Sequence, residues 1–522
     1  MTTVGTTGGH VITGAEVVVY GATGAGVMAA VAAARAGADT VLVEVGRHIG
    51  GMVSGGLGWT DVGQAAAIGG LSREFYERVA EHYGTGLWGV HGPEPHIAEA
   101  LLVQLIEESG VRVEMGQGVT GVDANGARIR AIESNGRHFQ AAVYVDATYE
   151  GDLLAAAGAS YRVGREPRSL YNERWGGRQP ATRPSRHNFD VLVSPFSDHD
   201  GTVLPLIRAP ALDDHGWPAE NQGEGDGAVQ AYAYRLCLTD DPAKRTSFPP
   251  PDGYDPGRYE LVARYLAMKG ESVTAGSLMV LVPNLLPGRK TDANSIGPVS
   301  LNLLDGSNWR YPEAGTDERA AIRGHHLRYT QGLLYFLAND PNVPGHISSE
   351  MRRWGLCKDE FVDTGGWPHQ LYIREGRRLV GTRVLTEADV AGGRMPADVI
   401  AMGSYNIDIR ETQRTWQYLP EFTRTPAVFN EGYVSVAVPA YGIPYRSLLP
   451  LRQECENLLV PVALSASHVA FSSVRMEPTW MCLGHAAGEA AALAAAQHRT
   501  PHDIAVTVLQ QRLHDAGQVL SL

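Results

Sequence analysis

Short apolar runs alternate with Gly- and Ala-rich segments near the start of the chain. Glu16–Tyr20 and Thr40–Glu44 are rich in β-branched residues, which predicts two short buried strands. Between them, Val27–Ala36 is rich in alanine and ends at Gly37, which predicts a helix. The order strand, glycine turn, helix, strand is typical of a dinucleotide-binding unit.

The turn between the first strand and the helix reads Gly-Ala-Thr-Gly-Ala-Gly. Gly21 allows a tight turn, and Gly26 lets the helix pack closely on the strand. The usual second glycine of this fingerprint is Thr23 here, although Gly24 follows. Glu44 ends the second strand, where a carboxylate binds ribose hydroxyls and disfavours the 2′-phosphate of NADP. A βαβ unit without a ligand is the alternative interpretation.

A glycine-rich loop, Arg47–Asp61, follows the second strand directly. NAD enzymes do not need such a loop, whereas FAD requires the chain to run closely along its pyrophosphate and ribityl groups. We therefore predict FAD as the cofactor, with Gly50, Gly51 and Met52 among its contacts. Because some flavoproteins attach the flavin to a histidine in this region, His48 is a candidate for covalent attachment.

Four segments resemble those of the FAD-dependent oxidoreductases of the glutathione-reductase-like superfamily, and of a bacterial group within it. They are Gly50–Asp61, Asp146–Asp152, Trp367–Glu375 and Ser465–Ala470, and the resemblance extends over nearly the whole chain. It implies an α/β fold, in which a Rossmann-like FAD-binding domain carries an inserted α+β substrate or cap domain. It leaves the substrate open.

The resemblance also implies cofactor contacts from two later strands. Val119, in a strand expected over 118–122, would meet the adenine through its backbone; plain sheet packing is the alternative. Ala147 and Thr148 end an apolar strand that would lie beside the cofactor. Asp152, which follows, caps the next helix in an alternative interpretation.

The composition changes after the first third of the chain. We expect an FAD-binding part over 15–165, a substrate or cap domain over 166–435, a second FAD-binding part over 436–500 and a C-terminal helix over 501–522. Within these parts, further helices are expected over 94–109, 253–266 and 319–337, and a polar surface loop over 172–188.

Glu456–Leu464 predicts a strand near the C-terminus, and Thr479–Leu493 predicts a long Ala-rich helix with Pro478 near its first turn. By the resemblance, this helix points its N-terminus at the flavin, where its dipole stabilises the charge of the reduced ring. Gly484 and Gly488 lie on one face, which predicts close packing against the sheet.

Three polar residues before and within this helix are expected near the flavin: His468, Arg475 and Glu477. Removing a hydride from a CH–OH or CH–NH carbon requires a base for the heteroatom proton, and histidine suits that task near neutral pH. Arg475 would hold an anionic substrate or the reduced flavin. Alternatively, Arg475 and Glu477 pair with each other, and His468 is an ordinary core histidine.

Alternating residues over Trp367–Arg378 predict a strand with one face toward the substrate. That face carries Tyr372 and Arg374, whereas Arg377 and Arg378 are expected on the solvated surface. No second glycine fingerprint accompanies this segment. We therefore expect the organic substrate to reduce the flavin, and oxygen or another acceptor to reoxidise it.

Composition narrows the partners further. The chain has 522 residues, enough for two or more domains, and a net charge of −13, which argues against nucleic acid as a partner. It has neither a leader pattern nor an apolar run of the ~20 residues that span a membrane, so we expect a cytoplasmic protein. The four cysteines form no Cys-x-x-Cys pair, so we expect no metal site. A homo-oligomer is left open.

These observations predict an FAD-dependent oxidoreductase, a dehydrogenase or oxidase, that removes a hydride from an alcohol or amine carbon of a small polar substrate. Two alternatives stay open at this point. One is a flavin monooxygenase that NAD(P)H reduces, and the other is a flavin-binding partner protein without catalysis.

Overall fold

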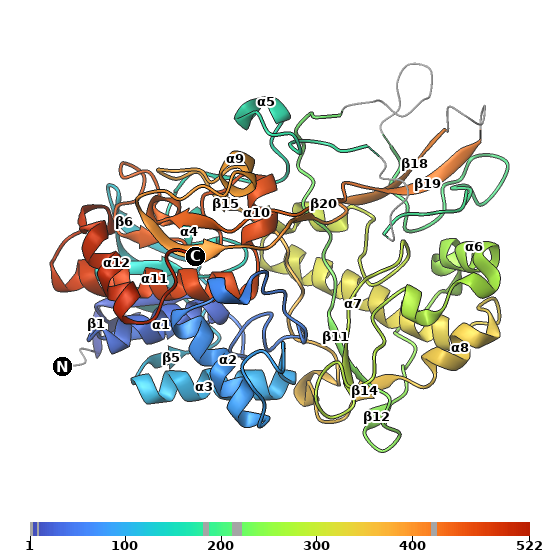
Figure 1. Cartoon of the computed structure of the whole chain (residues 1–522), viewed down its shortest axis with the longest axis horizontal. Helices are drawn as coiled ribbons and strands as arrows, with labels where there is room; N and C mark the ends of the chain where they lie inside the picture. The colour runs from blue at the N-terminus through green and yellow to red at the C-terminus, as the bar shows by residue number, and fades with distance from the viewer. Residues whose placement is uncertain (1–3, 8–9, 181–186, 211–221, 419–424) are drawn as a thin grey trace.

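The computed structural model describes residues 4–7, 10–180, 187–210, 222–418 and 425–522. Figure 1 shows both ends of the chain in one half of the molecule, together with α1 (Gly24–Arg35), α2 (Gly70–His82), α3 (Pro95–Ser109), α11 (Glu477–Ala496) and α12 (Val506–Asp515). Residues from the middle of the chain form the other half.

A five-stranded parallel sheet lies at the centre of the first half. Its strand order is β22-β9-β3-β4-β5, so it combines strands from both ends of the chain. The strands are β3 (Val17–Tyr20), β4 (Thr40–Val43), β5 (Arg112–Glu114), β9 (Val143–Asp146) and β22 (Leu458–Leu459). The strand–turn–helix–strand unit predicted at the N-terminus is present. Of the strand expected over 456–464, only Leu458–Leu459 form a strand, β22.

Side chains of the parallel sheet alternate between two apolar layers. On β3, Val17 and Val19 pack in the core that contains α1 and α11, whereas Val18 and Tyr20 pack against a second sheet. This second sheet has the order β1-β2-β8-β7-β6, with β1 (Val4–Thr7), β2 (His10–Gly14), β6 (Gly121–Asn125), β7 (Arg128–Ser134) and β8 (Arg137–Gln140). The result is three layers: helices, parallel sheet and a second sheet.

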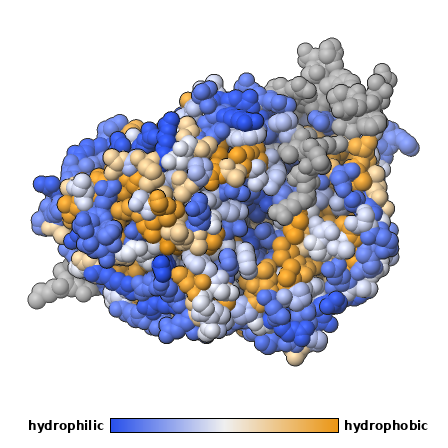
Figure 2. Space-filling model, in the orientation of Figure 1, coloured by the Kyte–Doolittle hydropathy of each residue, from blue (hydrophilic) through white to orange (hydrophobic). Residues whose placement is uncertain are grey.

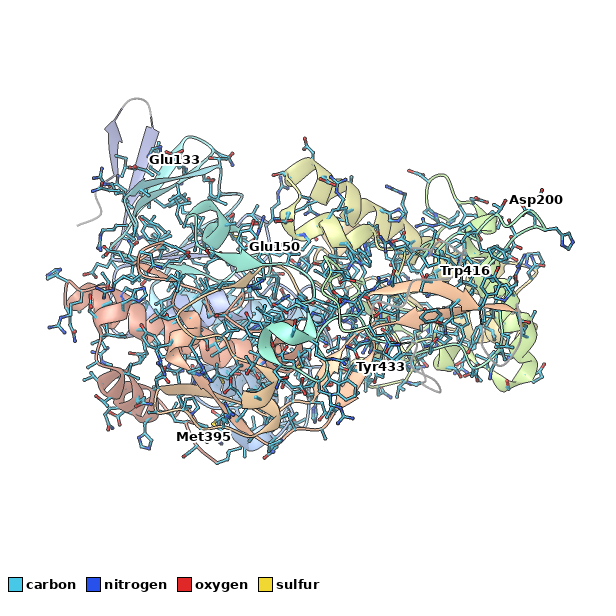
Figure 3. The ribbon with its side chains drawn as sticks, turned by 90° about the horizontal axis from the view of Figure 1, so that it is seen from above. Glu133, Glu150, Asp200, Met395, Trp416 and Tyr433 are labelled. Carbon is cyan, nitrogen blue, oxygen red and sulfur yellow. The ribbon has the colours of Figure 1, made fainter. Side chains whose placement is uncertain are left out.

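The other half is built on a four-stranded antiparallel sheet of order β12-β14-β11-β13. Its elements are β11 (Leu236–Thr239), β12 (Arg245–Thr246), β13 (Lys290–Ala293), β14 (Gly355–Cys357), α6 (Glu260–Lys269), α7 (Thr316–Asn339), α8 (Gly345–Met351) and the hairpin of β18 (Gln413–Tyr418) with β19 (Pro426–Glu431). Figure 3 shows Trp416 and Asp200 toward the end of this half and Glu133 at the opposite end of the molecule.

Short two-stranded sheets join the middle of the chain to its two ends. β10 (Tyr161–Arg162) pairs with β15 (Arg378–Leu379), β16 (Val399–Gly403) with β21 (Tyr441–Pro444), and β17 (Ile407–Ile409) with β20 (Val434–Val436). β16 contacts α11, and β17 contacts α10 (His468–Val474). The remaining short helices are α4 (Asp152–Ala156), α5 (Arg168–Tyr171) and α9 (Glu387–Ala391).

Three predicted elements differ in the structure. The strand expected over 118–122 begins only at Gly121, because the Val119 N–H donates to the Tyr20 hydroxyl at 2.9 Å instead of joining a ladder. The helix expected from 253 begins at Glu260, after a 3₁₀ turn that starts at Pro256. The polar loop over 172–188 is partly buried at both ends, as Glu173 and Asn188 show, and 181–186 lie outside the described residues.

The strand predicted over Trp367–Arg378 is also wrong. Tyr372 makes one isolated bridge with Ala233, and only Arg378 enters a strand, β15. The segment has side chains packed on all sides, so its backbone bonds to scattered partners, such as the Tyr232 hydroxyl that donates to the Glu375 carbonyl. Arg377 and Arg378 are buried, not solvated, because both form ion pairs.

Hydrophilic side chains cover much of the face in Figure 2, and one of its apolar patches lies beside the C-terminus. Across the described part of the chain, none of the helices has both the length and the apolar character that crossing a membrane requires.

Candidate functional site

The glycine turn after β3 is tight and lies beneath the end of β9. Gly21 has a φ of +97°, and a Cβ there would lie 2.8 Å from the Thr148 Cγ2. A Cβ at Gly26 would collide with the Gly21 carbonyl oxygen. Both positions therefore require glycine, for the turn and for the close approach of α1 to β3.

Thr23 caps α1 and fixes the turn to its neighbours. Its Oγ1 accepts from the Gly26 N–H at 3.1 Å and donates to the Ala147 carbonyl at 2.8 Å. The Gly50 N–H donates to the Ala22 carbonyl at 2.7 Å, which places the glycine-rich loop beside the turn. The first N–H groups of α1 have no acceptor within the helix and form its positive end.

Glu44 follows β4 and reaches back to the same turn. Its carboxylate accepts from the Ala22 N–H and from the Gly46 N–H, each at 2.6 Å. Burial raises the pKa of Glu44 above its ordinary value, against the effect of these two N–H groups. The carboxylate thus lies against the glycine turn, and its contact with a ribose stays a prediction.

The C-terminal helix α11 packs on α1. A Cβ at Gly484 would collide with the Ala25 carbonyl oxygen, and a Cβ at Gly488 with the Ala29 carbonyl oxygen. The prediction that these glycines pack against the sheet is therefore corrected: they let two helices approach at backbone distance. α11 lies along the Ala-rich face of α1, and other parts of α11 contact β9 of the parallel sheet.

Glu477 begins α11 and points at the glycine turn. Its Oε1 accepts from the Tyr149 hydroxyl at 2.6 Å, and that hydroxyl accepts from the Met52 N–H at 2.9 Å. Its Oε2 is buried without a partner and lies 3.0 Å from where a Cβ of Gly24 would be. Burial raises the pKa of Glu477 to about 8, despite the hydrogen bond from Tyr149.

Tyr149 also limits the glycine-rich loop, because a Cβ at Gly51 would lie 2.5 Å from its hydroxyl oxygen. The two distant segments, the turn near the N-terminus and α11 near the C-terminus, therefore meet at Gly24. The donor set fits FAD: helix N–H groups bind phosphate oxygens, and the Glu44 carboxylate accepts from ribose hydroxyls.

His468 is the first residue of α10, and its buried ring contacts the carboxylate of Glu375. Its Nδ1 lies 2.8 Å and 3.0 Å from the two carboxylate oxygens of Glu375. Burial alone would raise the pKa of Glu375, but His468 and Arg378 hold it below its ordinary value. Because an ionised carboxylate only accepts, Nδ1 of His468 carries a proton, and Nε2 is the ring nitrogen left for another partner. Nε2 is buried and has no partner.

Two further ion pairs hold this dyad in place. Arg378 pairs with Glu375 and, at 2.7 Å, with Glu166. The other oxygen of Glu166 accepts from the His468 backbone N–H at 2.9 Å. Glu166 also lines a cavity of about 540 Å³, together with Tyr161, Arg162, Val163, Arg165, Pro167, Glu224 and Gly225.

Arg475 pairs with Asp408, not with Glu477. Its Nη2 donates to the Asp408 carbonyl at 2.8 Å and lies 3.2 Å from the Asp408 carboxylate. The Nε of Arg475 is buried without a partner. The pairing of Arg475 with Glu477 that the sequence left open does not form, because Tyr149 binds Glu477.

Tyr372 lies between two guanidinium groups. The Arg374 Cζ is 4.7 Å and the Arg235 Cζ is 5.3 Å from the centre of its ring. Arg235 pairs with Asp292 through two hydrogen bonds. Arg374 donates to the Ala231 carbonyl, and its pKa falls to about 9 because of burial and the nearby Arg410.

A cavity of about 460 Å³ opens next to this arginine cluster. It is lined by Trp59, Thr60, Asp61, Val62, Gly63, Gln64, His91, Ser404, Tyr405, Asn406 and Val438. The Trp59 carbonyl accepts from Arg235 at 3.3 Å, and Tyr405 lies within electrostatic range of Arg475 and Tyr372. The cavity thus borders Arg235 through Trp59, whereas Tyr372, Arg374 and Arg475 are not among its lining residues.

Two other candidates, His48 and Asp152, have different partners. Both ring nitrogens of His48 contact carboxylates, Nδ1 that of Glu99 at 3.2 Å and Nε2 that of Asp363 at 3.0 Å, so neither faces a ligand. Asp152 pairs with Arg319 at 2.7 Å and with Arg377. It does not cap α4; the Thr148 side chain and Asp146 accept from the first N–H groups there.

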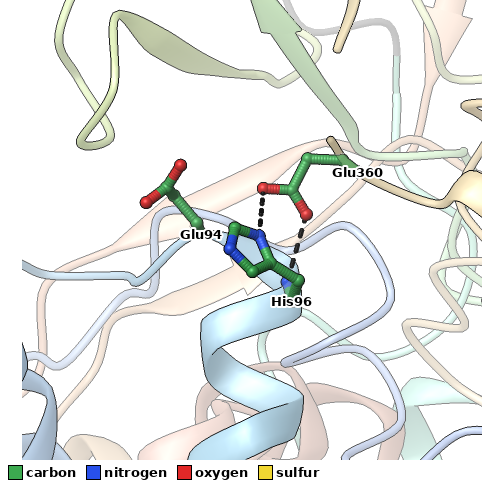
Figure 4. Close-up of side chains that lie close together, drawn as sticks. All are labelled: Glu94, His96 and Glu360. Atoms are coloured by element: carbon green, nitrogen blue, oxygen red, sulfur yellow. Dashed lines mark hydrogen bonds and ion pairs between the residues drawn. The ribbon is translucent and has the colours of Figure 1, made fainter. Parts of the chain in front are cut away.

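Figure 4 shows Glu94, His96 and Glu360, whose side chains come close enough to hold a metal ion. The His96 Nδ1 lies 2.8 Å from Glu360. However, the Lys290 ammonium lies 2.6 Å from Glu94 and 2.7 Å from Glu360. Because an internal cation already neutralises these carboxylates, we assign no metal to the cluster.

Sequence reasoning missed several residues of the site. Glu375 lies 93 positions before His468, and no pattern in one sequence links them. Tyr149 and Glu375 each belong to a segment that the sequence singled out, which was the available signal. No signal in the sequence pointed to Asp408 or Arg235, because their neighbours in the chain form no motif.

A parallel sheet with a capped glycine turn, an acid after the second strand and a C-terminal helix against the turn defines a Rossmann-like FAD-binding oxidoreductase. The chain belongs to the FAD dependent oxidoreductase family, whose sequence model matches residues 16–513. It is therefore an enzyme and its cofactor is FAD, as the sequence predicted. Two predictions stay predictions: that the organic substrate, and not NAD(P)H, reduces the flavin, and that this substrate is an alcohol or an amine.

Solved structures align with less than a third of the chain. OxyS anhydrotetracycline hydroxylase from Streptomyces rimosus aligns over 30% of this chain and 35% of its own, at 18% identity and a TM-score of 0.24. L-proline dehydrogenase from P. horikoshii aligns over 29% and 58%, at 18% identity and a TM-score of 0.24. L-amino acid deaminase from Proteus vulgaris aligns over 32% and 54%, at 15% identity and a TM-score of 0.24. No curated protein matches. These alignments carry no argument about the substrate.

Proposed function

We propose that this enzyme oxidises an alcohol or amine carbon of a small polar substrate, with His468 as the base. The substrate loses a hydride from its carbon and a proton from its oxygen or nitrogen. FAD, when bound, supplies the acceptor for the two electrons. His468 takes the heteroatom proton at Nε2, and Glu375 stabilises the imidazolium that results.

The observation that carries this proposal is the buried nitrogen of His468. Nδ1 is held by Glu375, so when the ring is neutral its lone pair lies on Nε2. Nε2 is buried without a partner, and a buried polar atom without a hydrogen bond is costly in an ordinary core. Such a nitrogen is suited to receive a proton from a ligand, rather than to stabilise the fold.

The test is anaerobic bleaching of the FAD-loaded protein by a panel of small alcohols and amines. We expect one class to bleach the flavin without NAD(P)H. His468→Asn removes the base and should slow bleaching by about 100- to 10,000-fold, with FAD still bound. His346→Asn is the matched control, because His346 lies on α8 and its Nε2 contacts the Val273 carbonyl oxygen. Bleaching by NADPH alone, or equal rates in both variants, would contradict the proposal.

The remaining expectations belong to the same proposal. We infer a bacterial member of the glutathione-reductase-like superfamily, with an FAD-binding domain over 15–165 and 436–500, a C-terminal helix over 501–522 and an inserted cap over 166–435. The parallel sheet, which combines strands from both ends of the chain, supports this division. We also infer a cytoplasmic enzyme that uses oxygen or another acceptor; a homo-oligomer stays open.

A further inference from the structure

Arg374 differs from the other buried arginines around the first cavity. Arg235, Arg410 and Arg475 each have a carboxylate partner: Asp292, Glu411 and Asp408. Arg374 is 3% exposed, and the structure shows its guanidinium bonded to the Ala231 carbonyl and lying near the Tyr372 ring. A buried cation usually has an anionic partner, because desolvation without one is costly.

The surroundings of Arg374 increase this cost. Arg410, Arg475 and Arg235 carry charges of the same sign and lower the pKa of Arg374, whereas the Tyr372 side chain acts in the opposite direction. Burial and these neighbours lower its pKa to about 9, far below the ordinary range of arginine. Asp61, which lines the cavity, interacts with Arg235 and Arg475.

A second orphan donor lies in the same cluster. The Nε of Arg475 is buried without a partner, although the rest of that guanidinium binds Asp408. Tyr405, which lines the cavity, lies within electrostatic range of both Arg475 and Tyr372. Among the described residues, Arg475 therefore keeps one buried donor without an acceptor, and Arg374 has no carboxylate partner.

We propose that the substrate of this enzyme is a carboxylate, whose anionic group binds the guanidinium of Arg374 beside Tyr372. A carboxylate supplies two acceptor oxygens and one negative charge, which is what this group of donors lacks. This inference rests on the proposed function, since it names the substrate class of the same site.

The first test needs no variant. The FAD-loaded protein is titrated with propionate and benzoate, and separately with propionamide and benzamide, while calorimetry and the flavin absorption spectrum report binding. A charge-assisted hydrogen bond to a buried arginine predicts binding of the acids about 10- to 100-fold tighter than the amides. Equal affinity of each acid and its amide, or binding of neither acid, would overturn the inference.

A variant assigns the effect to the residue. Arg374→Gln should remove the preference for acids, and Arg374→Lys should restore part of it. Arg383→Gln is the control, because Arg383 pairs with Asp389 outside the cavity. FAD stoichiometry and the unfolding midpoint report whether each variant is folded. If Arg374→Gln keeps the preference for acids, whether or not it also loses FAD, Arg374 is not the carboxylate site.

This result is separate from the proposed function. Acid-selective binding without bleaching by any substrate leaves the anion site standing and overturns the oxidation proposal. Bleaching by neutral alcohols or amines, together with equal affinity for acids and amides, overturns the anion site and leaves the oxidation standing.

Discussion

Replacing Glu477 with glutamine tests whether a neutral carboxyl group lies against the glycine turn. Glutamine keeps the shape of the side chain and accepts the Tyr149 hydrogen bond through its carbonyl oxygen. Burial raises the pKa of Glu477 from 4.5 to about 8 in the folded protein. Between these values the folded chain keeps a proton that the unfolded chain has released.

The sign follows from that difference. Folding binds the proton in this window, so the free energy of unfolding falls as pH rises, by about 1.4 kcal/mol per pH unit and by roughly 5 kcal/mol over the whole window. Glutamine has no proton to lose. The free energy of unfolding of Glu477→Gln, minus that of the wild type, should therefore rise by about 1.4 kcal/mol per unit between about pH 5 and pH 8.

Urea unfolding of the FAD-free proteins over this pH range measures the difference, with Glu81→Gln as the control. Glu81 is an exposed carboxylate on α2, so its removal should leave the pH dependence of the wild type unchanged. A difference between Glu477→Gln and the wild type that stays constant with pH would refute the reasoning, because it would mean that Glu477 is solvated.

Other predictions concern the cofactor and the core. The FAD affinity of the wild type should fall above about pH 8, because an ionised Glu477 would repel the diphosphate. Glu477→Gln should bind FAD equally well below and above that pH. Fluorescence titration with FAD measures both affinities. Gly488→Val should separate α11 from α1, lower the unfolding midpoint and release FAD. Gly345→Ala at the start of α8, where a Cβ meets no atom within 4 Å, should do none of these; thermal unfolding and gel-filtered absorption spectra will show the difference. Lys290→Met should destabilise the fold by about 3 to 5 kcal/mol in urea, because Glu360 is then buried without a cation; a neutral effect would mean that solvent reaches the cluster.

The sequence predicted the part of the fold that local chemistry determines. β3, the turn from Gly21 to Gly26, α1 and β4 are contiguous, so strand propensity, glycine conformation and helix signals appear in one short stretch. The cofactor followed from that stretch and from the glycine-rich loop after it.

Contacts between distant segments could not be predicted in the same way. The alanines of α11 suit packing on a sheet or on a helix equally well. The sequence alone therefore could not show that Gly488 packs against α1. The pairing of His468 with Glu375 depends on how two irregular segments cross. The apolar and polar residues over 367–378 alternate as in a strand, but residues 371–378 are all buried in an irregular segment, so the alternation does not mark one buried and one solvated face.

The measurement that tests the central claim most directly is an experimental structure of the FAD-loaded enzyme with a carboxylate bound. We predict the diphosphate of FAD at the N-terminus of α1, beside Gly24, and the reactive carbon of the ligand within reach of the His468 Nε2. A diphosphate bound elsewhere, or a wall of protein atoms between that nitrogen and the ligand, would contradict the account.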